Sequence, residues 1–151
     1  MTVKFKAEID FEKIKDDILE QVGNNLEIAA SDQISIIQNN ARKQQGYDGK
    51  FKPLSPRYKA LKEKAGRVGK ANLELTGQLM QSLQTKQERN NGKISTKIFV
   101  QDAPGNKSPI GDSKASVAEK AISNDETRPF LGLSEKDKDR IFNYIKRKLK
   151  I

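Results

Sequence analysis

The sequence contains no cysteine, no histidine and no tryptophan. Without cysteine the chain cannot form a disulfide, use a thiolate nucleophile or bind a metal through sulfur. Without histidine it lacks the commonest general base and the commonest imidazole metal ligand, so neither a hydrolase triad nor a zinc site is expected. We therefore predict that the protein is not an enzyme, that it has no catalytic or metal-binding residues, and that it needs no cofactor.

Long apolar runs are also missing. No stretch approaches the ~20 apolar residues of a membrane span, and Met1–Lys6 lacks the apolar block of a signal peptide. We expect a soluble protein with no membrane contact. Hydrophobic residues make up 34% and charged residues 32% of the 151 residues, which predicts a single domain with a thin core. A thin core favours further burial by self-association.

Two carboxylate pairs are the candidates for acid–base or metal chemistry, Asp16 with Asp17 and Asp137 with Asp139. Both pairs lie among lysines on segments that are predicted to be helical. We interpret them as solvated charged faces, and Asp137 would also favour the start of its helix. Glycine-rich phosphate-binding signatures are absent.

One long amphipathic helix is predicted from Phe11 to about Gln45, with Asp10 as its N-cap. Its apolar residues recur mostly at steps of three and four and form one stripe. A helix of this length is longer than a small domain, so one end is expected to project or to pack on a neighbour. Gly23-Asn24-Asn25 is the expected weak point, where the helix could kink or split. The stripe consists of Phe11, Ile14, Ile18, Val22, Leu26, Ala29, Ile37 and Ala41.

Two segments show the alternation of β-strands. Thr2–Asp10 places Val3, Phe5, Ala7 and Ile9 on one side, which predicts a half-buried strand. Residues 83–88 and 93–101 flank Asn90-Asn91-Gly92, and Asn-Gly between alternating runs predicts a β-hairpin with a type I′ turn. In its second strand Ile94, Thr96, Ile98 and Val100 should face one way and Phe99 the other.

Shorter helices are predicted from their caps. Ser55-Pro56 should begin a helix that runs to about Ala65, and Thr76 should cap a second short one. Asp112 or Ser113 could cap a helix through Ile122 whose apolar side includes Val117 and Ala121. Ser134 begins a capping-box-like sequence, so a closing helix to about Lys150 is expected to bury Ile141, Tyr144, Ile145 and Leu149. Arg128–Leu133 is predicted to be a short strand-like segment at a sheet edge or at a strand start, because Pro129 cannot donate to a ladder.

These elements predict an α+β fold in which the long N-terminal helix packs on a small antiparallel sheet, with short helices and extended loops. Residues 1–151 form one domain in this interpretation. Residues 46–70 and 103–113 are rich in turn-forming residues and are expected to act as interface arms.

Charge is unevenly placed in this chain of net charge +9. Residues 8–27 are mainly acidic, whereas residues 50–70 contain eight basic residues and Glu63 as their one acidic residue, and Lys146–Lys150 adds a second basic run. The basic segment could be a solvated surface, a docking surface for an acidic partner, or a DNA-binding surface. The docking candidates are Lys50, Lys52, Arg57, Lys59, Lys62, Lys64 and Arg67.

Three segments, in this order, resemble the tailed-phage virion morphogenesis family, which contains the Mu-type tail completion proteins. They are Asp48–Tyr58 followed by a basic helix, Leu75–Leu83, and the Arg128-Pro-Phe-Leu-Gly-Leu-Ser-Glu-Lys-Asp segment. The resemblance covers roughly residues 41–151. Relatives often carry an aromatic-histidine-glycine segment before the Arg-Pro-Phe motif, whereas residues 118–124 here contain neither His nor Gly.

The resemblance implies a structural protein of the head–tail junction, made in the bacterial host cytoplasm and located in the virion. Such subunits form a ring, expected to be a hexamer, between portal or adaptor proteins and the tail terminator or tail tube. Non-specific contact with the genomic DNA that passes through the ring is a further expectation. The neighbouring roles of tail terminator and head-closure protein stay open. A basic nucleic-acid-binding protein is the alternative from another class.

On this interpretation an arm docks on the adjacent subunit through aromatic and aliphatic side chains, and the basic residues dock on acidic partners. Arg128, Pro129, Phe130 and Leu131 would serve as core or interface residues. The expected arm anchors are Tyr47, Phe51, Leu54 and Tyr58.

Overall fold

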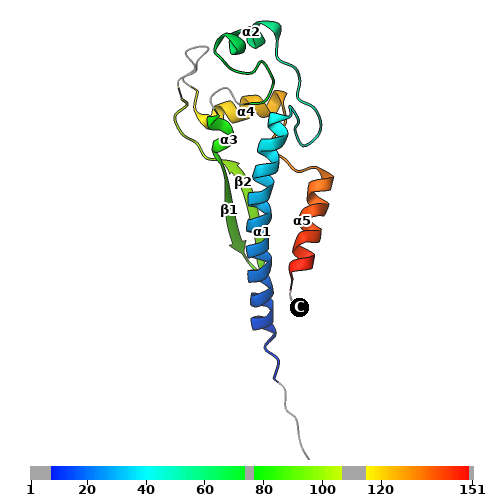
Figure 1. Cartoon of the computed structure of the whole chain (residues 1–151). Coiled ribbons are helices and arrows are strands. Elements are labelled where there is room, and N and C mark those ends of the chain that lie inside the picture. The colour runs from blue at the N-terminus through cyan, green and yellow to red at the C-terminus, as the bar shows by residue number, and fades with distance from the viewer. Residues whose placement is uncertain (1–7, 74–76, 107–114, 150–151) are drawn as a thin grey trace, which may run out of the picture.

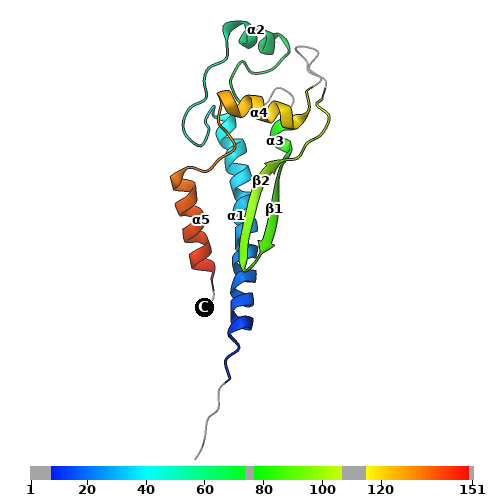
Figure 2. The same ribbon diagram turned by 180° about the vertical axis from the view of Figure 1, so that it is seen from behind.

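A computed structural model describes residues 8–73, 77–106 and 115–149. The molecule is elongated around one long helix, with a β-hairpin on one side of it and the C-terminal helix on the other (Figure 1; Figure 2 shows the opposite view). This is the predicted α+β fold. In chain order the elements are α1 (Phe11–Arg42), α2 (Pro56–Lys64), α3 (Gln78–Gln81), β1 (Leu83–Asn90), β2 (Lys93–Val100), α4 (Val117–Thr127) and α5 (Glu135–Lys148).

Helix α1 is continuous over 32 residues, and the Asp10 side chain caps it by accepting from the Lys13 N–H. The helix does not split at Gly23, the expected weak point. Gly23 is buried beneath the hairpin, and its carbonyl accepts a hydrogen bond of 2.7 Å from Gln87 Nε2. A Cβ at this position would lie 3.1–3.2 Å from Gln87, Arg89 and Ile94. Glycine therefore allows the hairpin to approach α1 closely, and this packing outweighs its poor helix propensity.

The hairpin confirms its sequence prediction. β1 and β2 pair antiparallel from Leu83 opposite Val100 to Asn90 opposite Lys93. Asn91 and Gly92 have φ values of 46° and 71°, as a type I′ turn requires. The predicted inward residues of β2 alternate with exposed ones and face α1, whereas Phe99 is exposed.

The core lies where the C-terminal half of α1 meets α3, α4 and the base of the hairpin (Figure 1). Ala29, Ala30 and Ala41 on α1 are buried and small, so neighbouring segments can pack close to the helix axis. The main cluster consists of Ile37, Ala41, Phe51, Ala71, Leu79, Met80, Leu83, Val117, Ala121 and Phe130.

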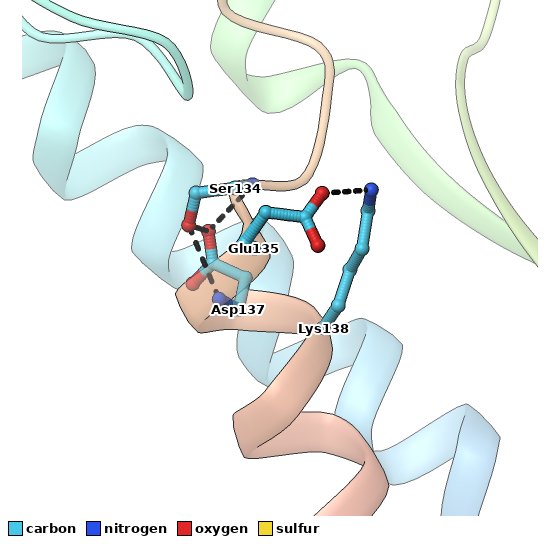
Figure 3. Close-up of polar contacts among 4 residues, drawn as sticks. All are labelled: Ser134, Glu135, Asp137 and Lys138. Carbon is cyan, nitrogen blue, oxygen red and sulfur yellow. Dashed lines mark hydrogen bonds and ion pairs between the residues drawn. The ribbon is translucent and has the colours of Figure 1, made fainter.

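The helix starts follow local capping chemistry. Ser55 caps α2 with Pro56 at the first helical position, as predicted. Helix α5 begins with the predicted capping box, in which the Ser134 hydroxyl and the Asp137 carboxylate each accept the other residue's backbone N–H (Figure 3). Beside this box, Lys138 pairs with Glu135 one turn away.

Helix α4 differs from its prediction at both ends. Its cap is Ser116, in a capping box with Glu119, and the helix continues to Thr127. Ile122, which we expected on its apolar side, is largely exposed. Asp102 holds the start of α4 to the end of the hairpin by accepting a hydrogen bond of 3.0 Å from the Ala118 N–H. This bond, together with one from the Ser116 side chain, lowers the pKa of Asp102.

Residues 128–133 form no strand, contrary to the prediction. The N–H groups of Phe130 and Leu131 both donate to Asp125 Oδ1, at 2.8 and 3.1 Å. A side-chain carboxylate at the end of α4 thus takes the donors that a β-ladder would have used.

Other predictions were right only in part. α3 begins at Gln78 after Gly77 in the left-handed conformation, and the expected cap Thr76 lies outside the described residues. The α5 residues Ile141, Tyr144, Ile145 and Leu149 are partly rather than fully buried. Of the predicted strand at residues 2–10, residues 2–7 lie outside the described residues, and Glu8–Asp10 form no strand. Residues 107–113 of the second predicted arm lie outside the described residues as well.

The contact between residues 46 and 129 should be essential for stability. A Cβ on Gly46 would lie 1.7 Å from the Pro129 carbonyl oxygen, which is a backbone atom that cannot move alone. We expect Gly46→Ala to lower the free energy of unfolding by about 2–3 kcal/mol, measured by urea denaturation. Gly66→Asn is the control, since a Cβ there meets nothing and Asn tolerates its φ of 72°. Equal stability of the two variants would contradict this account of the contact.

Candidate interaction surface

The first half of the predicted arm belongs to the domain's own core. The Phe51 side chain is only 6% exposed and lies in the main cluster, and its N–H donates to the Gln44 carbonyl at 2.8 Å. The prediction that Phe51 anchors the arm on an adjacent subunit was therefore wrong. Leu54 is also partly buried against the same cluster. The apolar residues of this segment hold it to α1 because the end of that helix supplies the nearest apolar surface.

Tyr47 and Tyr58 retain exposed surface, as interface residues require. Tyr47 is partly exposed and its ring lies over Gly132, where a Cβ would come within 2.4 Å of the ring. Tyr58 is partly exposed on α2. Both remain candidates for contact with another molecule.

The residues of the Arg128–Leu131 motif pack within the chain. Phe130 is among the most buried side chains, and Leu131 packs against the core cluster. Arg128 Nε donates to the Lys52 carbonyl at 3.1 Å, and Pro129 lies against Gly46. Two of the segments that carry the family resemblance therefore contact each other, and the core role is the one observed for Phe130.

Lys62 was predicted as a docking residue, and this was wrong. It is 3% exposed, and its ammonium donates to the Lys70 carbonyl and to Asn72 Oδ1, both at 2.7 Å. These bonds close the loop that follows α2. Sequence reasoning could not separate this lysine from its neighbours, because its partners are provided by the fold of residues 70–72.

The other basic residues of this region are exposed and form what we call the basic surface: Lys50, Lys52, Arg57, Lys59, Lys64, Arg67 and Lys70. Most of them lie on or beside α2, at the end of the molecule furthest from the start of α1 (Figure 1). The first two thirds of α1, with the residues just before it, are acidic. Residues 8–32 contain eight carboxylates and two lysines. The basic surface on and beside α2 is thus separate from an acidic stretch along α1.

The start of α1 exposes apolar side chains. Ile9, Phe11 and Ile14, which we call the helix tip, are 61%, 74% and 46% exposed. The hairpin reaches only as far as Lys15, whose side chain lies beside Gly92 in the turn. The predicted stripe therefore continues past the region that the described part of the chain covers. Sequence reasoning correctly indicated that one end of this helix would project.

A half-open apolar groove of about 240 Å³ lies between α5 and β2, with α1 as its floor. Gln33 is buried at its floor and accepts from Arg140 Nη2 of α5 at 2.5 Å. No sequence signal could have indicated this groove, because it arises from the spacing of three elements. Its lining residues are Leu26, Ala30, Gln33, Ile37, Thr96, Ile98, Leu131, Gly132, Leu133 and Ile141.

Within the described ranges, no cluster of three or more carboxylates could hold a metal ion. No helix in the same part of the chain is both long and apolar enough to cross a membrane. Comparison with models of known protein families, with curated proteins and with solved structures found no match for this chain.

The buried ammonium of Lys62 should stabilise the loop after α2. Lys62→Met keeps much of the side-chain volume but removes the ammonium that donates to the Lys70 carbonyl and to Asn72 Oδ1. We expect the free energy of unfolding to fall by about 1–3 kcal/mol in a thermal or urea melt. Lys59→Met and Lys64→Met, at exposed sites on the same helix, should change it by less than about 0.5 kcal/mol. Three indistinguishable variants would show that the Lys62 contacts are not formed in solution.

Proposed function

We propose that the protein is a structural subunit of the head–tail junction of a tailed phage, a tail-completion or neck protein that joins the tail to the DNA-filled head. The observation that carries this proposal is the exposed helix tip at the projecting end of α1. Phe11 and Ile9 would cost free energy if they stayed in water, and within the described residues no other element reaches the helix tip. A second protein chain is the natural cover for this surface.

The family resemblance supplies the kind of assembly. Its three motif segments occur in the expected order, and residues 46–54 and 128–131 pack against each other beside the C-terminal end of α1. This packing supports the resemblance, because motifs that define a fold should meet in its core. A tail terminator or head-closure protein remains the alternative within the structural class.

The basic surface, separate from the acidic stretch of α1, suits a part that contacts an acidic neighbour. The basic surface would dock on acidic faces of the portal, the adaptor or the tail tube. Tyr58 lies among these cations on α2 and could be buried with them.

A loss-of-function experiment tests the role. In the phage or prophage that carries the gene, a nonsense mutation should leave DNA-filled heads and finished tails unjoined, as counted by negative-stain electron microscopy. Purified protein added to such a lysate should restore infectious particles. Joined particles at the normal frequency without the protein would overturn the proposal.

Charge reversal on the basic surface should weaken joining in the same lysate assay. We expect Lys52→Glu, Arg57→Glu and Lys59→Glu together to reduce restored particles at least tenfold, because three attractive contacts become repulsive. The control carries the same charge change elsewhere, with Lys93→Glu, Lys136→Glu and Lys146→Glu at other exposed sites. An equal loss in both triple variants would mean that total charge, and not this surface, matters.

The same surface favours a second candidate function, that of a nucleic-acid-binding protein. Phosphate binding by several lysines releases counterions and gives a steep fall of affinity with salt. In a gel-shift series with duplex DNA, a DNA-binding protein would lose about 10³-fold or more in affinity between 50 and 200 mM salt. A neck subunit should show weak, non-specific retention at all these concentrations. A steep slope that the basic-surface triple variant abolishes would favour the second candidate.

A further inference from the structure

The outer edge of β2 is an open strand edge beside an apolar groove. In a hairpin with a two-residue turn, Asn90 and Lys93 form a hydrogen-bonded pair, and bonded and non-bonded pairs then alternate. The backbone N–H and C=O groups of Ile94, Thr96 and Ile98 therefore point away from β1. The sheet has two strands within the described residues, and no other described backbone group bonds to these three residues.

The groove runs along this same edge. Thr96 and Ile98 line it from β2 and Ile141 lines it from α5, while no residue of β1 takes part. In both ribbon views β1 lies furthest from α5 (Figures 1 and 2). A strand added to β2 on this side would therefore lie over α1 and between β2 and α5. It would complete the backbone ladder and fill the apolar space together.

We propose that this site binds the N-terminal segment, residues 2–10, of a second copy of the chain. The segment alternates Val3, Phe5, Ala7 and Ile9 with polar residues, so one face of an extended strand is wholly apolar. A cavity of ~150 Å³ holds one benzene ring. The groove of about 240 Å³ therefore has room for the ring of Phe5 and a small aliphatic neighbour.

The segment cannot fill the groove of its own chain. Glu8–Asp10 continue the line of α1 away from the hairpin and from α5 (Figure 1), so only residues 2–7 could turn back, with a reach of ~20 Å. The floor of the groove runs from Leu26 to Ile37, ~24–40 Å along α1 from Asp10 at 1.5 Å per residue. A neighbouring copy has no such limit.

An exchange of this kind joins a donor segment on one copy to a different site on the next. Such a contact is heterologous, so it forms rings when the rotation closes. The proposed contact between adjacent subunits rests on the proposed function, because that function supplies the ring. It adds to that function the segment and the site through which adjacent subunits bind. It also brings the helix tip of one copy next to its neighbour, because Ile9 belongs to the donor segment and Phe11 follows the segment directly.

The acceptor edge is tested with proline. Proline removes an N–H that faces away from the ladder and is tolerated on edge strands. Thr96→Pro blocks the outer edge of β2, and Thr85→Pro makes the same change on the outer edge of β1, since Thr85 also occupies a non-bonded pair position. Light scattering after size exclusion, at equal concentrations of the full chain, should show assembly lost in Thr96→Pro and kept in Thr85→Pro.

The donor is tested on its two faces. The double variant Val3→Asn and Phe5→Asn should lose assembly, whereas Lys4→Asn with Lys6→Asn on the opposite face should keep it. Mixing the Val3/Phe5 variant with Thr96→Pro is the decisive step, because one retains the acceptor and the other the donor. The mixture should give particles of twice the monomer mass and nothing larger. A mixture that stays monomeric would overturn exchange between copies.

A synthetic peptide of residues 2–10 tests the groove even if Thr96→Pro does not fold. Added to the assembled wild-type chain, it should dissociate the particles, and the peptide with Asn at positions 3 and 5 should not. If neither peptide acts and all variants keep the wild-type mass, the strand contact is wrong while a ring subunit still stands. Both proposals are overturned if the wild-type chain is monomeric in solution and when bound to heads or tails, and if it does not join heads to tails.

Discussion

The close packing of the hairpin on α1 is the interaction on which the rest of the structure depends. A two-stranded hairpin is marginally stable by itself in water, and a helix of this length needs a covered apolar face. Each supplies what the other lacks. Gly23 lets the strands come near, Gln87 bonds to its carbonyl, and Gln38 bonds to the Met80 carbonyl at the base of the hairpin. These contacts fix the hairpin along α1 from Lys15 to Gln38.

Features with a local cause could be predicted from the sequence. The caps Asp10, Ser55 and Ser134 and the Asn91-Gly92 turn each depend on a few adjacent residues, and all are present. Features decided by distant partners could not. Gly23 reads as a helix breaker until the hairpin covers it, and Arg128–Leu133 reads as a strand until Asp125 takes its donors. A local sequence pattern contains no information about partners that lie far away along the chain.

The candidate site follows the same division. The projecting helix end could be predicted, because an apolar stripe that is longer than a small domain cannot be covered by that domain along its whole length. The roles of Phe51 and Lys62 could not, since Lys62 lies among exposed lysines and Phe51 lies in a loop between two exposed lysines. Burial separates them. Phe51 meets the end of α1, and Lys62 meets two oxygen atoms of a loop that only the folded chain brings near.

Helix α5 is fastened to the body in an unusual way. It packs mainly on α1, none of its described residues is fully buried, and Arg140 donates a hydrogen bond to Gln33 of α1. Local opening of such a unit costs much less than global unfolding. Helix α5, which lines one side of the groove, can therefore move outward while the hairpin and α1 stay in place. The width of the groove can then change without unfolding the rest of the domain.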